Sequence, residues 1–237
     1  MLKDAFIDGL KAALPIMAGY VVLGLPCGLL CQQAGMSWAM VAIMSAIFYS
    51  GAGQYMIPNM YLAGNPLLSI IASVSLVNTR QMLYGASLSR FCESVSKHSA
   101  FLFGATVTDE SFGVNLARFE NGSWDVRRAT FVNLCSQTSW GLSCVAGTLI
   151  GELVSVPTAI ASFAMTSIFI CLLCMQKVNA TNLIAIFSAV LGVYLCKLVG
   201  LGGPAILLGA LLGMGCGYAH YALTKGRKNA VNDGGGA

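Results

Sequence analysis

Long apolar segments follow one another along almost the whole chain, separated by short polar connections. We read eight of them as candidate spans, at roughly residues 12–31, 37–62, 66–89, 99–118, 129–150, 157–176, 182–200 and 203–223. A helix needs about 20 apolar residues to cross the hydrocarbon of a bilayer, whereas the strands of a membrane barrel are shorter and alternate in polarity. The pattern therefore predicts an all-α integral membrane protein, a polytopic helical bundle with about eight transmembrane helices.

The first two segments carry residues that interrupt helices. In the first they are Pro15, Gly24, Pro26 and Gly28. The second contains YSGAGQ at residues 49–54, followed by Pro58. Proline removes a backbone donor and glycine lowers helix propensity. A membrane tolerates such breaks where protein or a water-lined cavity satisfies the freed backbone groups. The sequence predicts that both helices are bent or broken.

The composition agrees with a membrane location. Of the 237 residues, 57% are hydrophobic and 9% are charged, whereas a soluble domain carries about 25% charged residues. So few charges cannot cover a surface that faces water. We expect contacts with membrane lipid and none with nucleic acid. Residues 1–224 are predicted to form a single transmembrane domain, followed by a short cytoplasmic tail at residues 225–237.

The basic residues are distributed unevenly between the two ends of the predicted spans. With a cytoplasmic N-terminus and eight crossings, the inside holds Lys3, Lys11, Arg118, Arg127, Arg128, Lys177, Lys225, Arg227 and Lys228. The outside holds Arg90 and Lys97, with Lys197 near an outer end. Since cytoplasmic loops are enriched in Lys and Arg, this asymmetry predicts a multi-pass protein with both termini in the cytoplasm.

Opposite charges lie at matching depth in the third and fourth segments. Arg80 and Asn78 are near the middle of residues 66–89, and the pair Asp109–Glu110 is near the middle of residues 99–118. An arginine at the bilayer centre costs about 3 kcal/mol on insertion scales. Consecutive segments joined by a short loop usually pack together. We predict that Arg80 pairs with one of the two carboxylates, and the sequence does not say which.

The second carboxylate leaves two interpretations open. One arginine neutralises one carboxylate, so the other must be protonated, reach water or meet a cationic group. Either the pair is a purely structural ion pair, or the second carboxylate is functional and receives a substrate ammonium group or carries a proton.

Other polar residues are candidates for substrate binding or coupling. A helix that begins within YSGAGQ would present backbone N–H groups to a carboxylate, although its glycines also suit tight packing. The stripe that contains Gln137 and Trp140 suits either a pathway lining or hydrogen bonds between helices. The full candidate set is Ser50, Gly51, Gly53, Gln54, Asn78, Arg80, Asp109, Glu110, Gln137 and Trp140.

No motif indicates catalysis, a metal or a cofactor. The sequence lacks GxxxxGK[ST], HExxH and GxSxG. The single CxxC, Cys171 and Cys174, lies in an apolar run with no flanking histidine, which favours packing over metal binding. We expect no catalytic residue, no metal and no cofactor. Gly209, Gly213 and Gly217 form a ridge that predicts a close helix contact, either within the chain or with a partner.

Several of these stretches resemble the AzlC family. They are FIDGLKAALPIMAGYVVLGLPCG, SAIFYSGAGQYM, VNTRQMLYGASLSRF, TDESFG, the region of Trp140 and Gly141, and LLGALLGMGCG. The resemblance implies a permease of the bacterial cytoplasmic membrane that exports branched-chain and other hydrophobic amino acids. It also implies an ion gradient, such as that of protons, as the driving force, and a small AzlD-like membrane protein as partner. Ser162 departs from the family pattern, which has an aspartate there.

Two other functions compete with export of branched-chain amino acids. The chain would be an accessory membrane subunit if its polar residues only fix helix packing, or it would transport a different small zwitterion. An intramembrane enzyme would need a nucleophile or metal site that the sequence does not offer.

Overall fold

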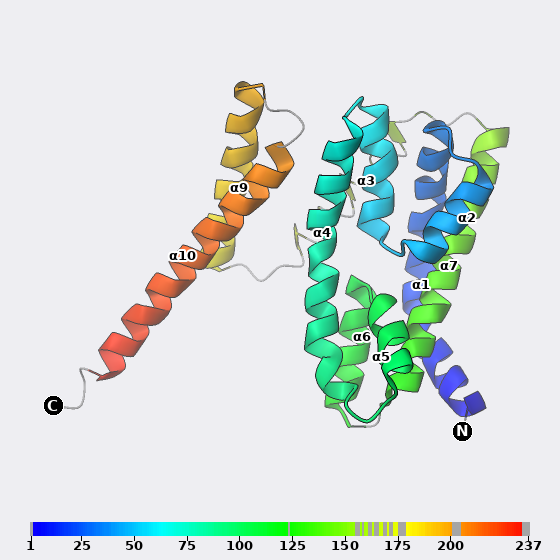
Figure 1. The fold of residues 1–237 in the computed structure, drawn as a ribbon, viewed down its shortest axis with the longest axis horizontal. Coiled ribbons are helices and arrows are strands. Elements are labelled where there is room, and N and C mark those ends of the chain that lie inside the picture. The colour runs from blue at the N-terminus through cyan, green and yellow to red at the C-terminus, as the bar shows by residue number, and fades with distance from the viewer. Residues whose placement is uncertain are drawn as a thin grey trace. The chain divides into compact units, whose positions relative to one another are not determined.

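The computed structural model describes residues 2–122, 124–154, 179–200 and 205–233, with isolated positions between residues 157 and 174. Every regular element in these ranges is helical (Figure 1). They are α1 (Leu2–Gln33), α2 (Trp38–Ile47), α3 (Gly51–Leu62), α4 (Leu67–Leu88), the 3-10 turn η1 (Ser89–Phe91), α5 (Lys97–Ala105), α6 (Asp109–Glu120), α7 (Val126–Leu153), α9 (Ala180–Leu198) and α10 (Ala205–Asp233). The all-helical prediction is confirmed. Ser162, Cys171 and most of segment 157–176 lie outside the described residues.

The helices belong to two compact units. The first contains Met1–Gly64 and Val77–Ile168, and the second contains Asn65–Leu76 and Phe169–Ala237. All ten candidate residues belong to the first unit. In the second, the glycine ridge of α10 packs on α9 of the same chain, because a Cβ at Gly213 would lie 2.7 Å from the Cβ of Ala189. The predicted close contact is therefore within the chain. The single domain of residues 1–224 stays a prediction.

The first unit is built around α1 and α7, which run parallel. Gly9 of α1 faces Phe131 near the start of α7, and Gly28 faces Cys144 and Thr148 farther along. Side chains of α7 also donate to backbone carbonyls of α1: Ser139 to Met17, Ser143 to Tyr20 and Thr148 to Gly28. Glycines allow the close approach, and the hydroxyl groups satisfy carbonyl oxygens inside the interface.

The first predicted segment is not broken at its prolines and glycines. The structure has one unbroken helix of 32 residues that contains both Pro15 and Pro26. The Tyr55 hydroxyl of α3 adds a hydrogen bond to this helix next to Pro26, donating to the carbonyl of Leu23 at 2.5 Å. Proline is tolerated in such helices where side chains nearby satisfy the freed backbone groups.

The second predicted segment is broken, as expected, into α2 and α3. The break lies at residues 48–50, and the glycines fall in the first turn of α3. α2 packs against α7 and ends near the middle of α7, where the carbonyl of Ala46 accepts from Gln137. α3 starts beside Trp140 and returns along α1 as far as Leu23 and beyond. The two helices form a hairpin whose ends lie where α1 finishes.

The prediction that residues 99–118 form one span is wrong. The structure has α5 and α6, separated at residues 106–108. Arg90 and Glu120, which flank this pair, lie 3.3 Å apart, and Phe91 stacks on Phe119 with ring centroids 4.3 Å apart. The chain from residue 97 to residue 120 therefore runs into the first unit and returns to the same end of it, near the start of α7. Thr108 caps α6 in a capping box with Ser111, which begins a new helix instead of continuing the old one.

The two hairpins enter the first unit from opposite ends. In Figure 1, α2 and α3 lie along one end of α7, and α5 and α6 lie along the other. Their turns both reach the middle of α1, at Tyr20. This places two helix N-termini, those of α3 and α6, in the interior of the unit.

Among the described helices, two are long and apolar enough to be clear candidates for crossing a membrane. They are α1 and α9. α4 and α7 have sufficient length, 22 and 28 residues, but carry the polar residues that contact other helices. The number of crossings stays a prediction.

Candidate functional site

Side-chain amides satisfy the carbonyl groups that the α2–α3 break exposes. The Nε2 of Gln54 donates to Phe48 O at 2.6 Å, and that of Gln81 donates to Tyr49 O at 3.3 Å. The Nε2 of Gln137 donates to Ala46 O at 3.0 Å. These glutamines come from α3, α4 and α7. An unsatisfied carbonyl in a buried site is costly, so the three amides make this break stable.

Gln54 and Trp140 are joined in the interior. The Oε1 of Gln54 accepts from the indole nitrogen of Trp140 at 2.8 Å and from the Ser45 hydroxyl at 3.2 Å. Both residues are almost fully buried. The indole ring packs on Gly51, where an added Cβ would lie 3.6 Å from the ring. Their polar atoms are thus occupied in holding the start of α3.

The N-terminus of α3 is capped by Ser50. Its hydroxyl oxygen accepts from the N–H of Gly53 at 3.2 Å, and the hydroxyl donates to the Oδ1 of Asn78 at 2.6 Å. Among the described residues, the N–H groups of Gly51 and Ala52 have no acceptor. A helix N-terminus with free N–H groups favours an anion. This is the arrangement expected for YSGAGQ, shifted so that the glycines lie within the helix.

The α5–α6 break is held by a second amide from α7. The Nδ2 of Asn133 donates to Phe103 O at 3.2 Å, and its Oδ1 accepts from Asn115 at 3.0 Å. Asn133 and Gln137 are four residues apart and so lie on one face of α7. One face of α7 therefore serves both breaks.

Arg80 pairs with Asp109. The Nη2 of Arg80 lies 2.8 Å from the Oδ2 of Asp109, and the Tyr84 hydroxyl donates to Oδ1. About a quarter of each charged side chain is exposed, 29% for Arg80 and 23% for Asp109. Asp109 is also the first residue of α6, where the helix dipole stabilises a negative charge. The predicted ion pair is confirmed, and Asp109 is its carboxylate.

Glu110 has a different environment. Its Oε2 accepts from the Tyr20 hydroxyl at 2.6 Å, and among the described residues it forms no ion pair. The residue is exposed, unlike the buried Thr108 and Ser111 beside it. Adjacent helical positions point about 100° apart, so one carboxylate faces Arg80 and the other faces α1.

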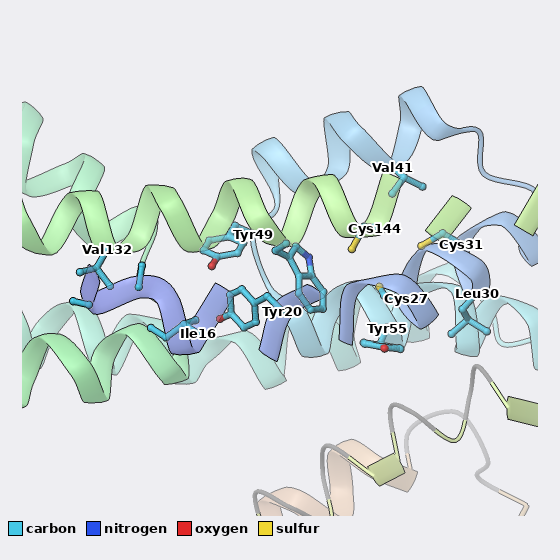
Figure 2. Close-up of a cluster of buried hydrophobic side chains, with 13 residues drawn as sticks. Ile16, Tyr20, Cys27, Leu30, Cys31, Val41, Tyr49, Tyr55, Val132 and Cys144 are labelled. Carbon is cyan, nitrogen blue, oxygen red and sulfur yellow. The ribbon is translucent and has the colours of Figure 1, made fainter. Parts of the chain in front are cut away.

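Tyr20 is the site residue that sequence reasoning missed. Its hydroxyl lies 2.8 Å from Thr108 Oγ1, and its ring packs edge-on against Trp140 with centroids 5.3 Å apart. Figure 2 shows its ring beside that of Tyr49, between α1 and α7. Tyr20 is the single tyrosine in the otherwise apolar segment 12–31, and this was the signal available.

Comparison with known proteins identifies the family. The family described as AzlC protein matches residues 15–154, more than half of the chain. The chain belongs to the AzlC family.

Relatives in this AzlC family have been found in several bacteria. The "Branched-chain amino acid transport protein AzlC" of Bacillus subtilis is 27% identical over 215 residues, 88% of this chain and 82% of that protein. The "Inner membrane protein YgaZ" of Escherichia coli is 31% identical over 62% of this chain and 61% of its own length. A Helicobacter pylori membrane protein is 29% identical over 75% of this chain and 78% of its own. No solved structure matches significantly.

The AzlC match places the described site within the family region. Residues 15–154 include both hairpins, α4 and all of α7, and with them all ten candidate residues. The relatives are named as membrane or transport proteins. This AzlC-family chain is thus a membrane protein of a transport family and not an enzyme.

Proposed function

We propose that this protein is a secondary transporter that exports branched-chain and other hydrophobic amino acids across the bacterial cytoplasmic membrane, driven by an ion gradient such as that of protons. The name of the Bacillus subtilis relative supports the substrate class. The absence of a nucleotide-binding motif from the sequence supports coupling to a gradient.

One observation carries the proposal: Asp109 pairs with Arg80, whereas Glu110 is bound by a neutral hydroxyl. A carboxylate with no cation beside it is stabilised by water, by a proton or by a cationic ligand, and the exposed side chain of Glu110 is accessible to all three. Glu110 receives the ammonium group of the amino acid, or carries a proton during the cycle. The ion pair of Arg80 and Asp109 holds α6 against α4 while this happens.

The substrate carboxylate is received at the start of α3. The free N–H groups of Gly51 and Ala52 and the helix dipole favour an anion there. Ser50 and Asn78 hold this turn in place through their hydrogen bond. Gln54, Gly53, Gln137 and Trp140 act behind it by keeping the break open, since their contacts are with the α2–α3 hairpin itself.

Both termini are cytoplasmic, and the two hairpins do not cross the membrane. The crossings among the described helices are then α1, α4, α7, α9 and α10; residues 157–176, which the sequence predicts as a further span, lie mostly outside the described residues. This arrangement moves Arg90 and Lys97 to the cytoplasmic side, with Arg118 and Arg127. Apart from Arg80 within the membrane, Lys197 is then the single basic residue assigned to the outside. The excess of Lys and Arg on the cytoplasmic side is therefore larger than with eight crossings, and this favours the hairpin topology.

A small AzlD-like membrane protein is the proposed partner. The glycine ridge of α10 contacts α9, so the partner binds another surface. Co-expression with such a protein should raise the amount of folded transporter or its rate. If neither changes, the chain acts without this partner.

A second candidate function is that of an accessory subunit with a polar packing core. The hydrogen bonds of Gln54, Gln81 and Gln137 favour it, because they satisfy the α2–α3 break without a ligand. The two functions differ in what they require of Glu110, which a packing subunit does not need.

Counterflow of radiolabelled leucine and valine in proteoliposomes tests the proposal, with and without the partner. We expect exchange by the wild-type protein, near-complete loss with Glu110→Gln, and retained folding of that variant. Asp109→Asn should instead impair folding, because Arg80 loses its counter-charge. Equal counterflow by wild type and Glu110→Gln would contradict the role of Glu110. Absence of counterflow by the wild type would contradict the substrate class.

A further inference from the structure

Tyr20 contacts both helix breaks. It lies in the middle of α1 and is 5% exposed. Its hydroxyl contacts Thr108 and Glu110 at the start of α6. Its ring packs edge-on against Tyr49, which directly precedes the Ser50 cap of α3, with centroids 6.4 Å apart. One side chain of α1 thus joins two hairpins that enter from opposite ends.

The direction of the hydrogen bonds follows from the chemistry of the groups. An ionised carboxylate only accepts, so the single proton of the Tyr20 hydroxyl goes to Glu110. The Tyr20 oxygen can then only accept from Thr108, whose hydroxyl lies closer to Tyr20, at 2.8 Å, than to Ser111 Oγ, at 3.3 Å. The donor to Glu110 is therefore held at both ends, by the helix cap of α6 and by a ring packed between Tyr49 and Trp140. A donor held in this way fixes the orientation of the carboxylate it binds.

We propose that Tyr20 is a positioning residue for the amino-acid substrate. It orients the carboxylate of Glu110 to accept the ammonium group, while its ring keeps the residues before α3 in place for the substrate carboxylate. The ligand class is a zwitterionic α-amino acid, whose two charged groups are then received by the two hairpins. This inference rests on the proposed function, since it takes Glu110 as the ammonium acceptor.

Replacing single hydroxyl groups tests the inference. Tyr20→Phe keeps the ring and removes the hydroxyl. Tyr55→Phe is the matched control, because Tyr55 is a buried tyrosine that also packs against Trp140, and its hydroxyl donates to the α1 backbone and not to Glu110. Counterflow of radiolabelled leucine gives KM and the maximum rate for each reconstituted variant.

Tyr20→Phe should raise KM for leucine about tenfold, because a hydrogen bond to a charged group is lost, with a maximum rate within about twofold of wild type. Tyr55→Phe should leave KM within about twofold. In a Glu110→Gln protein that retains residual exchange, adding Tyr20→Phe should change KM less than about twofold. Hydrogen exchange, which needs no transport, should accelerate at residues 108–112 in Tyr20→Phe and not in Tyr55→Phe.

The outcomes separate this inference from the proposed function. If the wild type exchanges leucine and Tyr20→Phe leaves KM unchanged, Tyr20 is a packing residue and the inference is overturned, while the proposed function stands. If the wild type exchanges neither leucine nor valine, the proposed substrate class fails, and the assignment of Tyr20 to that substrate fails with it. Unchanged hydrogen exchange in Tyr20→Phe would overturn the positioning of α6 independently of transport.

Discussion

The α2–α3 and α5–α6 hairpins have the same geometry and opposite chemistry. Each brings a helix N-terminus to the middle of the first unit, near Tyr20. The start of α3 is neutral and capped by Ser50, and neutral amides satisfy the carbonyl groups before it. The start of α6 already carries two carboxylates, Asp109 and Glu110. The free dipole of α3 favours an anion, whereas the acidic start of α6 favours a cation.

Under the proposed function, this difference lets a pair of similar elements hold one zwitterion. A substrate with a carboxylate and an ammonium group needs two sites of opposite preference at close range. Two helix N-termini alone would both prefer the carboxylate. Placing acidic residues on α6 and none on α3 removes that ambiguity.

The largest expected effect is in the labelling of lysines, which tests the topology. A lysine on one side of the membrane is labelled from that side and almost not at all from the other. Lys3, Lys97 and Lys197 are all exposed. If residues 37–62 form a hairpin and do not cross, an impermeant amine reagent should modify Lys97 together with Lys3 in inside-out vesicles. It should modify Lys197 in right-side-out vesicles. Peptide mass spectrometry gives the pattern, with Lys3 as the internal control. Modification of Lys97 from the side of Lys197 would show that residues 37–62 cross the membrane.

The next largest effect concerns the charges that distinguish α6. Arg80→Ala leaves Asp109 without its cation and should lower the free energy of unfolding by about 2 to 3 kcal/mol, less than for a fully buried pair because part of each side chain is exposed. Arg90→Ala, which breaks the exposed pair with Glu120, should cost less than about 1 kcal/mol. A thiol-reactive fluorescent maleimide measures unfolding in detergent through the buried Cys27, Cys31 and Cys144. Equal losses would mean that the ion pair of Arg80 contributes no more than a surface pair.

The free energy of unfolding should fall by a smaller amount when the α2–α3 hairpin loses a side-chain amide. Gln54→Met leaves the indole N–H of Trp140 without its partner and Phe48 O with the Ser50 N–H alone, which should cost about 2 kcal/mol. Gln137→Met is the matched control, since it removes an amide from a more exposed position of the same break and should cost about 1 kcal/mol. The same thiol assay measures both. If Gln54→Met were as stable as wild type, the amides would not be what stabilises this break.

The smallest effect compares one glycine in each hairpin. A Cβ at Gly53 would lie 2.8 Å from the Phe48 ring, whereas a Cβ at Gly113 of α6 would meet nothing within 4 Å. Gly113→Ala should therefore stabilise the protein by about 0.5 kcal/mol through helix propensity. Gly53→Ala should destabilise it by about 1 kcal/mol, because the Phe48 ring must move. Thermal unfolding of the two variants gives the direction of each stability change. If both substitutions changed stability in the same direction, α3 would not be packed more tightly than α6.

Much of the architecture follows from local pattern. The ends of α4, α7 and α9 agree with the predicted segments to within a few residues, because these are long apolar runs between polar connections. The break before α3 was also predictable, since glycines and Ser50 weaken a continuous helix and cap a new one. The break before α6 carried a signal too, in TVTDES, where β-branched residues lead into a capping box. Hydropathy hides that signal, because the mostly apolar residues 100–107 are followed by Phe112, Val114 and Leu116, which extend the apolar pattern.

The sequence by itself determined that this is a helical membrane protein of the AzlC family with an arginine and two carboxylates at depth. Three features were decided by the tertiary structure. The prolines of α1 do not break it, and α1 is packed along its length on α7 and bonded by Tyr55 and the hydroxyl groups of α7. Asp109, and not Glu110, meets Arg80, because the start of α6 at Asp109 sets the rotation of that helix. Tyr20 became a site residue only when two distant hairpins folded onto α1. Each depends on contacts between residues far apart in the chain, and no local propensity or periodicity records such contacts.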